Sequence, residues 1–196
     1  MSTTQRNWRV KEGALPLWAW GIIAFVWNYG IGSLNHNFGK WIGFYLFSPK
    51  GESVFAHSKM IALPWILFLF AYHIWQAAYK YYDYILPQNK LSGAVSLVFQ
   101  SWFVIGFYYF FCEFHIHGLW LDILNFGVTT LLGFVLWIIL GRWRIPVPVD
   151  FAFSVLILAP LFTHQQYCTY ETCNGTMYTD WSVVLNGSYC AEDRWA

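Results

Sequence analysis

Charged side chains are scarce in this chain. Only 11% of its residues are Asp, Glu, Lys or Arg and 58% are hydrophobic, against roughly 25% and 45–50% in a typical soluble domain. A soluble fold of this composition would have too little charge to cover its surface, so the composition indicates a membrane protein. The formal net charge is +1, which provides neither a basic field to attract nucleic acid nor an acidic field for a basic partner.

Several catalytic signatures are also absent. The sequence has no glycine-rich phosphate loop, no Cys-x-x-Cys pair, no His-Glu-x-x-His motif and no His-x-x-His-His box, the patterns that mark nucleotide binding, dithiol chemistry and known metal sites. None of its apolar runs carries the arginine series of a voltage sensor. It also lacks the paired, interrupted apolar segments of many secondary transporters.

Long apolar runs are what the chain does have. A hydrocarbon core about 30 Å thick needs about 20 apolar residues per helix, and the sequence predicts five spans, over residues 15–34, 58–82, 92–111, 119–140 and 149–162. The first run is too long for the apolar core of a signal peptide and is predicted to be a retained span. Aromatic residues make up 22% of the chain, and Trp and Tyr favour membrane interfaces. The predicted fold is an all-α, polytopic transmembrane bundle in contact with lipid.

Polar segments flank the predicted transmembrane domain, residues 15–162. Residues 1–14 form a polar N-terminal segment, and residues 163–196 form a polar C-terminal tail. Residues 35–47 are aromatic but too short and glycine-rich to span, so we expect them to lie along the membrane surface. The fifth span is short and must extend through Gln166, tilt little or cross a thin region of bilayer.

Lysine and arginine positions predict the orientation. With five spans and a cytoplasmic N-terminus, seven basic residues are cytoplasmic (Arg6, Arg9, Lys11, Lys80, Lys90, Arg142 and Arg144) and four are outside (Lys40, Lys50, Lys59 and Arg194). This follows the positive-inside rule. The C-terminal tail is then extracytoplasmic.

Cysteine placement agrees with this orientation. All four cysteines then face the oxidising side of the membrane, where disulfides form: Cys112, Cys168, Cys173 and Cys190. Sequence alone does not choose among the three possible pairings. The tail also contains two Asn-x-Ser/Thr sequons, at Asn174 and Asn186, which are glycosylation signals only in a eukaryotic secretory pathway.

The same orientation gathers chemistry-bearing residues at the outer membrane face. Five of the six histidines fall at the outer ends of predicted spans. Two carboxylates lie in the same region, within residues 112–122. Imidazole and carboxylate groups are ligands for copper, iron and zinc. The sequence therefore predicts an outer-face metal site, with copper or iron favoured, whose candidate ligands are Glu113, His115, His117, Asp122 and His164.

Simpler interpretations of these residues stay open. Histidines at helix ends, such as His36 and His57, are also ordinary interfacial residues. Asp122 is well placed to interact with the dipole of the fourth helix near its start. It also begins a stripe with Asn125 and Thr129, at i, i+3 and i+7, which we expect to face the bundle interior because polar groups are costly against lipid.

His73 lies inside the second predicted span. An ionisable group at such a position is a functional hypothesis by default, so His73 is a candidate cofactor ligand, for haem or a pigment. The competing interpretation is a hydrogen bond to a neighbouring helix, with Asn28 or Gln100 as the candidate partner.

The segment Phe114-His115-Ile116-His117, beside an outer-face carboxylate, resembles local pieces of the integral subunits of copper membrane monooxygenases. The likeness covers four residues and assigns no roles. Two functions from different classes follow. One is a redox or oxygenase-type subunit of a larger membrane complex, whose metal acts on a small or lipid-soluble substrate. The alternative is a non-catalytic accessory subunit that packs against partner proteins, lipids or pigments.

Overall fold

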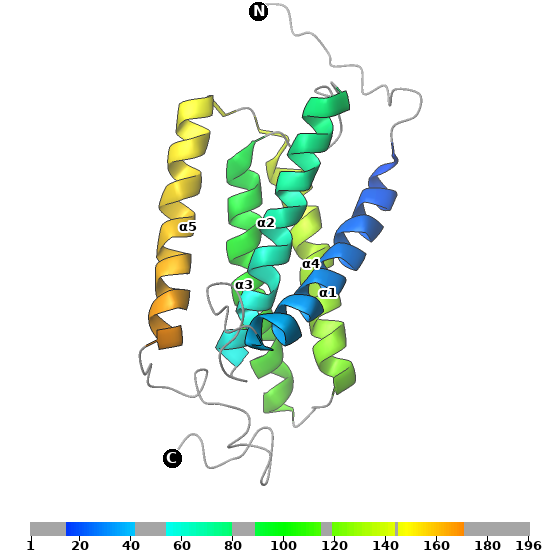
Figure 1. Ribbon diagram of the computed structural model, residues 1–196, viewed down its shortest axis with the longest axis vertical. Helices are drawn as coiled ribbons and strands as arrows, with labels where there is room; N and C mark the ends of the chain where they lie inside the picture. The colour runs from blue at the N-terminus through cyan, green and yellow to red at the C-terminus, as the bar shows by residue number, and fades with distance from the viewer. Residues whose placement is uncertain (1–14, 42–53, 80–88, 115–118, 144, 171–196) are drawn as a thin grey trace, which may run out of the picture.

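Five long helices make up the part of the chain that the structure describes. The structure is a computed structural model that describes residues 15–41, 54–79, 89–114, 119–143 and 145–170, and the side chains at several helix ends are outside this description. The helices are α1 (Leu17–Trp41), α2 (Val54–Tyr79), α3 (Lys90–Glu113), α4 (Leu119–Leu140) and α5 (Val147–Tyr170) (Figure 1). Within the described ranges there is no β-strand.

Each helix is long and apolar enough to cross a membrane. In hydrocarbon no water is available to the backbone, so a spanning segment must satisfy its own amides and carbonyls, as an α-helix does. Large apolar side chains remain exposed on the outer surface, among them Ile22, Phe70, Phe110, Leu131 and Leu156. The predicted all-helical, multi-pass architecture is confirmed, and these surfaces suit contact with lipid.

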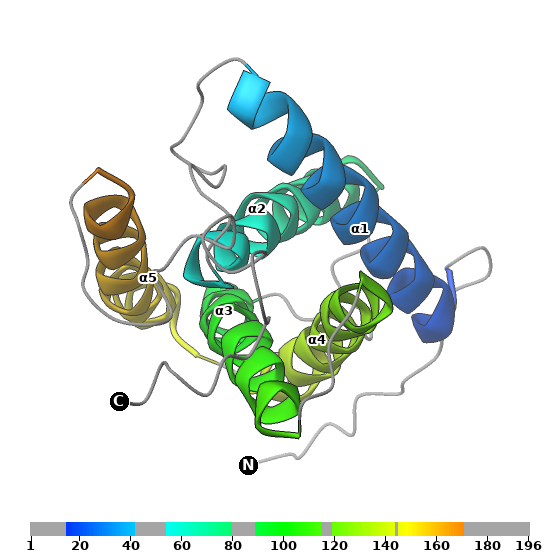
Figure 2. The same cartoon turned by 90° about the horizontal axis from the view of Figure 1, so that it is seen from below.

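Four helices form a ring and the fifth stands outside it. Each of α1 to α4 packs against its two neighbours, with α4 closing the ring against α1, whereas α5 packs mainly against α3 (Figure 2). Successive helices run in opposite directions (Figure 1). The ends of α1, α3 and α5 therefore lie at the same end of the bundle as the starts of α2 and α4.

Two helices are longer than the hydropathy pattern predicts. The helix α1 continues to Trp41, so residues 35–41 of the predicted surface segment belong to the same helix as the first span, and residues 42–47 lie outside the described residues. The helix α5 has 24 residues and continues past Gln166, so the extension named above as one of three alternatives for the short fifth span is the one that the structure has. Polar residues that find buried partners can continue a helix beyond its apolar run. Asn35 and Gln165, for example, are buried.

An aromatic cluster fills one half of the ring. It consists of Trp65, Phe68, Tyr72, Phe134 and Trp137, all nearly inaccessible to solvent. The Trp137 ring lies at the centre, with its centroid 5.2 Å from that of Tyr72 and 5.9 Å from that of Trp65. Edge-to-face packing of this kind adds stability beyond the buried area. The Trp65 indole also donates a hydrogen bond to the carbonyl of Gly93 in α3, at 3.2 Å.

Side chains of the α3 and α5 starts cap the helix termini at that end of the bundle. Asn89 accepts a hydrogen bond from the Ser92 amide at 2.8 Å and donates to the Trp143 carbonyl at 3.0 Å. The buried carboxylate of Asp150 accepts from the amides of Lys90 and Leu91, at 2.8 and 2.7 Å. These first amides of a helix have no partner within the helix. Asp150 therefore joins α5 to the start of α3.

Candidate functional site

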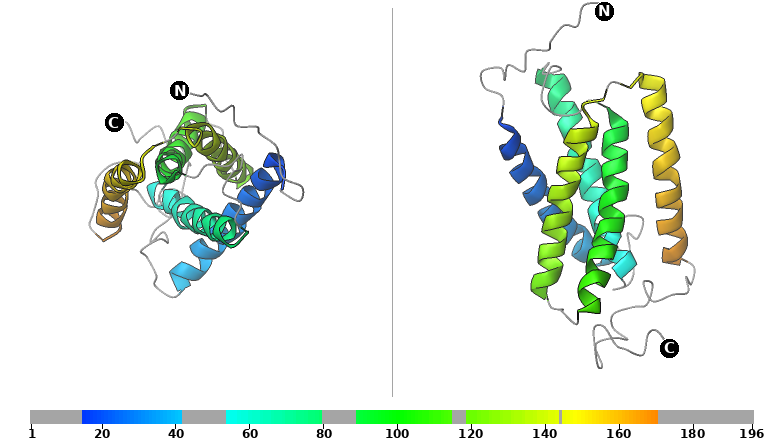
Figure 3. Two further views of the ribbon diagram at one scale, coloured as in Figure 1. Left: turned by 90° about the horizontal axis from the view of Figure 1, so that it is seen from above. Right: turned by 180° about the vertical axis from the view of Figure 1, so that it is seen from behind.

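The end of the bundle opposite these caps gathers the helix positions that carry histidines and carboxylates. His36 lies near the end of α1, His57 in the first turn of α2, and Glu113 is the last residue of α3. Asp122 lies in the first turn of α4, and His164 is in the last turns of α5. Figure 3 shows these five helix ends from behind, at the bottom of the bundle. We call this end the histidine end.

The predicted metal ligands themselves are only partly described. His115 and His117 lie outside the described residues, as do the side chains of Glu113 and Asp122. Among the residues that the structure describes, no three of His, Cys, Asp and Glu are grouped so that they could hold a metal ion. The predicted site, like the disulfides of the predicted tail, whose cysteine side chains also lie outside the description, stays a prediction.

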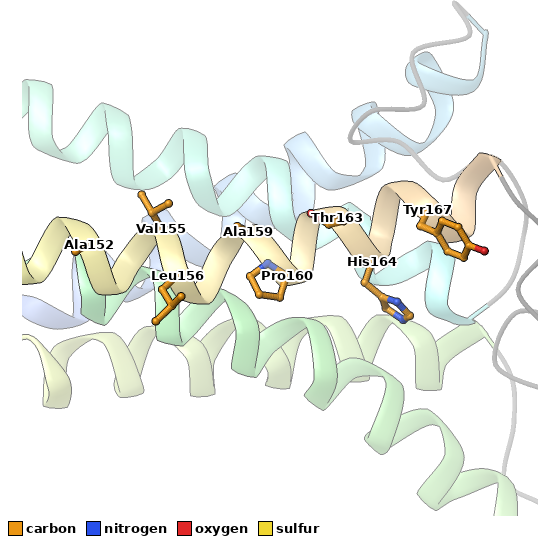
Figure 4. A pocket seen from close by; sticks show the side chains of 8 residues that line it. All are labelled: Ala152, Val155, Leu156, Ala159, Pro160, Thr163, His164 and Tyr167. Carbon is orange, nitrogen blue, oxygen red and sulfur yellow. The ribbon is translucent and has the colours of Figure 1, made fainter.

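The remaining candidate ligand, His164, is half-buried on α5. It lines a shallow groove along this helix together with Ala152, Val155, Leu156, Ala159, Pro160, Thr163 and Tyr167. Figure 4 shows these side chains projecting along α5, with Pro160 one turn before the imidazole of His164. Proline has no amide proton, so Pro160 leaves the carbonyl one turn earlier without its helical donor.

His73 lies in the later half of α2, away from the histidine end. It is half-buried, and its ring centroid lies 5.5 Å from that of Tyr72. The side-chain amide nitrogens of the two predicted partners donate hydrogen bonds within their own helices. Asn28 Nδ2 donates to the Ala24 carbonyl at 3.0 Å, and Gln100 Nε2 donates to Ser96 Oγ at 3.1 Å. Cofactor ligation by His73 stays a prediction.

The predicted polar stripe of α4 does face the bundle interior where it is described. Asn125 and Thr129 are both buried. Asn125 Nδ2 donates to the Val104 carbonyl of α3 at 2.8 Å, and Thr129 Oγ1 donates to Asn125 Oδ1 at 3.2 Å. The Asn125 amide thus has partners at both ends and links α4 to α3.

A second polar contact between α3 and α4 was not predicted from the sequence. Ser96 Oγ donates to the Gly133 carbonyl at 2.6 Å and accepts from Gln100 Nε2. The Gln100 side chain lies directly on Gly133, where an added Cβ would stand 2.5 Å from Gln100 Nε2. Ser96 and Gln100 are four residues apart within an apolar run, and that spacing is the signal that could have identified them.

Lys59 is buried within α2 and is only 1% exposed. This corrects its assignment to the first outer loop. The predicted membrane orientation stays a prediction. The preceding residue, Ser58, accepts a hydrogen bond from Gln165 Nε2 of α5 at 3.3 Å. A buried lysine in a transmembrane helix is costly and usually functional.

These observations define the protein as an integral membrane protein of five candidate spanning helices, with a polar interior in one half of its ring. Comparison with protein-family models, with curated proteins and with solved structures finds no match.

Proposed function

We propose that this protein is an integral subunit of a larger membrane complex of the redox or oxygenase type, with a His/carboxylate metal site at the histidine end. The candidate ligands are Glu113, His115, His117, Asp122 and His164. The observation that carries the proposal is the antiparallel order of the five helices. This order brings sequence positions from 36 to 164 to one end of the bundle (Figure 1).

The packing of α3 and α4 strengthens the proposal. The two helices are ring neighbours, and Asn125 in α4 reaches the Val104 carbonyl in α3. Glu113 ends α3 and Leu119 begins α4, so His115 and His117 belong to a short connection between adjacent helices. A connection of this length keeps its flanking residues within roughly 20 Å of each other.

The helix α5 contributes the remaining candidate ligand, His164. It packs against α3, and Gln165 Nε2 donates a hydrogen bond to Ser58 Oγ, so the last turns of α5, with His164, lie beside the start of α2 at the histidine end. Mixed imidazole and carboxylate ligands suit copper or iron, and an incomplete set leaves a coordination position open for a substrate. A site at the membrane face would admit a small or lipid-soluble substrate.

Elemental analysis of the protein purified in detergent from its native membrane tests the proposal. We expect copper or iron in stoichiometric amount in the unaltered protein and its loss in His117→Ala. His73→Ala is the matched control, because His73 lies away from the histidine end, and we expect it to retain the metal. The absence of metal from the unaltered protein would refute the proposal, and so would equal metal content in all three proteins. A haem absorption band that disappears in His73→Ala would instead assign a cofactor to α2.

The exposure of α5 supports the alternative of a non-catalytic accessory subunit. This helix lies outside the ring, and its groove includes the small side chains of Ala152 and Ala159 (Figure 4). Small residues let two transmembrane helices approach closely, so the partner would be a spanning helix of another subunit.

Native electrophoresis of the complex distinguishes the two functions. An accessory subunit would assemble normally after His117→Ala but fail after Ala159→Leu. Val135→Leu, on the exposed face of α4, is the control for a larger side chain facing lipid. Normal assembly of Ala159→Leu would contradict the accessory role of this face.

A further inference from the structure

Two buried carbonyl oxygens in the bundle interior have no hydrogen-bond donor among the described residues: Asn28 Oδ1 of α1 and Gln100 Oε1 of α3. Both side chains are completely inaccessible to solvent. The Thr130 hydroxyl of α4 is likewise buried without a partner in the part of the chain described. A buried polar atom without a hydrogen bond costs about 1–3 kcal/mol, so these three, which belong to a larger set in the described part of the chain, require an explanation.

The hydrogen bonds of the same side chains fix which atom is the oxygen. Asn28 Nδ2 contacts the Ala24 carbonyl, which can only accept, so the nitrogen must lie there. Ser96 Oγ gives its proton to the Gly133 carbonyl, so it must accept from the nitrogen of Gln100. Exchanging nitrogen and oxygen in either amide would place two acceptors together. The two atoms without donors are therefore carbonyl oxygens.

Contacts between the helices place these groups at similar depth. Ser96 contacts Gly133 and Asn125 contacts Val104, so in this antiparallel pair Gln100 falls level with Thr129. Tyr29 of α1 packs against Phe126 of α4, with ring centroids 6.1 Å apart. Asn28 therefore falls within a few residues of the same level, which is about one helical turn.

The ring places α1 and α3 on opposite sides of the interior (Figure 2). Both amides are fully buried, and Thr130 is a buried residue of α4, the helix that packs against both α1 and α3. The buried lysine of α2 does not serve these oxygens, since neither accepts a hydrogen bond from any described group.

We infer that the ring interior binds a small hydrogen-bond donor of about the size of water, held between Asn28 Oδ1 and Gln100 Oε1. Water matches the set: its two protons satisfy the two carbonyl oxygens, and its oxygen can accept from the Thr130 hydroxyl. Buried water typically makes about three such bonds. An ammonium ion has the same donor chemistry. The inference concerns the membrane interior and does not depend on a metal at the histidine end.

A double-mutant cycle on the full-length protein in detergent tests the inference. Asn28→Leu and Gln100→Met keep the approximate shapes of the side chains and remove the oxygens. If the two oxygens share a guest, each single variant should lower the thermal midpoint by about 3 °C or more. The double variant should then lose clearly less than the sum of the two singles. Unchanged or raised midpoints, or strictly additive losses, would overturn the inference.

Salt composition identifies the guest. The unaltered protein and Asn28→Leu are compared in ammonium, potassium and choline chloride at equal ionic strength. Stabilisation of the unaltered protein by ammonium alone, absent in Asn28→Leu, assigns an ammonium ion. Equal midpoints in the three salts, with the coupling retained, assign water. Equal stabilisation by potassium and ammonium would mean that the oxygens coordinate a metal cation, and would overturn a hydrogen-bond donor as the guest.

Discussion

Gly133→Ala should destabilise the protein far more than an alanine substitution at an unobstructed glycine. The added Cβ would overlap the Gln100 side chain, coming within 2.5 Å of its amide nitrogen. Gln100 is fully buried, so its amide can move only by displacing the groups around it. Overpacking costs about 1–3 kcal/mol, and displacing the amide also breaks its bond to Ser96 Oγ, worth about 1 kcal/mol. The expected cost is about 2–4 kcal/mol, or a fall of roughly 5–15 °C in thermal midpoint.

Thermal unfolding in detergent, followed by circular dichroism, measures this cost against a matched control. Gly106 of α3 is exposed and has nothing within 4 Å of an added Cβ, so Gly106→Ala should leave the midpoint unchanged or raise it slightly. Adding Gln100→Ala to Gly133→Ala should recover part of the loss, because it removes the overlapping amide. Equal midpoints for Gly133→Ala and Gly106→Ala would refute the packing described for the α3–α4 contact.

Three further outcomes follow from the buried polar groups. Asp150→Ala should cost about 2–4 kcal/mol, because two partly buried amides at the start of α3 lose their acceptor. Hydrogen exchange at those amides should accelerate, and unchanged exchange would contradict the cap. Asn125→Leu should lower the stability measured by thermal unfolding by about 1–3 kcal/mol, since the Val104 carbonyl loses its donor. An unchanged stability would count against the link between α3 and α4. In the folded protein, Lys59 should resist a water-soluble amine reagent, whereas the exposed Lys90 should react. Peptide mass spectrometry measures the labelling of both, and similar labelling would show that α2 does not bury Lys59.

The sequence was sufficient to locate the spanning helices but not all of their ends. The predicted fourth span, 119–140, agrees with α4 (Leu119–Leu140), because glycine and charged residues flank a continuous apolar run. The ends of α1 and α5 were predicted too early, because hydropathy falls where polar residues begin. Gln165 is buried nonetheless, through its bond to Ser58 of α2, a contact that no local pattern reveals.

The polar interior was predictable only where polar residues recur on one helix face. Asn125 and Thr129 showed this spacing, and their burial is confirmed. Gln100 was considered only as a partner for His73, because its position depends on Gly133, a residue 33 positions away whose missing side chain makes room for it. Lys59 was counted as a loop charge because residue type suggested a surface position. Contacts between helices, and not local composition, decided these positions.

The interior of the ring changes in character along its axis, and this relates the two proposals. The aromatic cluster around Trp137 occupies the half nearest the start of α3, where its rings pack edge to face. Asn28, Gln100 and Thr130 occupy the level beyond it, toward the histidine end. Water or a small cation crosses apolar packing at high cost, so entry past the aromatic cluster is unfavourable for a polar guest. The proposed metal site and the proposed interior guest are separate features on the same side of the aromatic cluster.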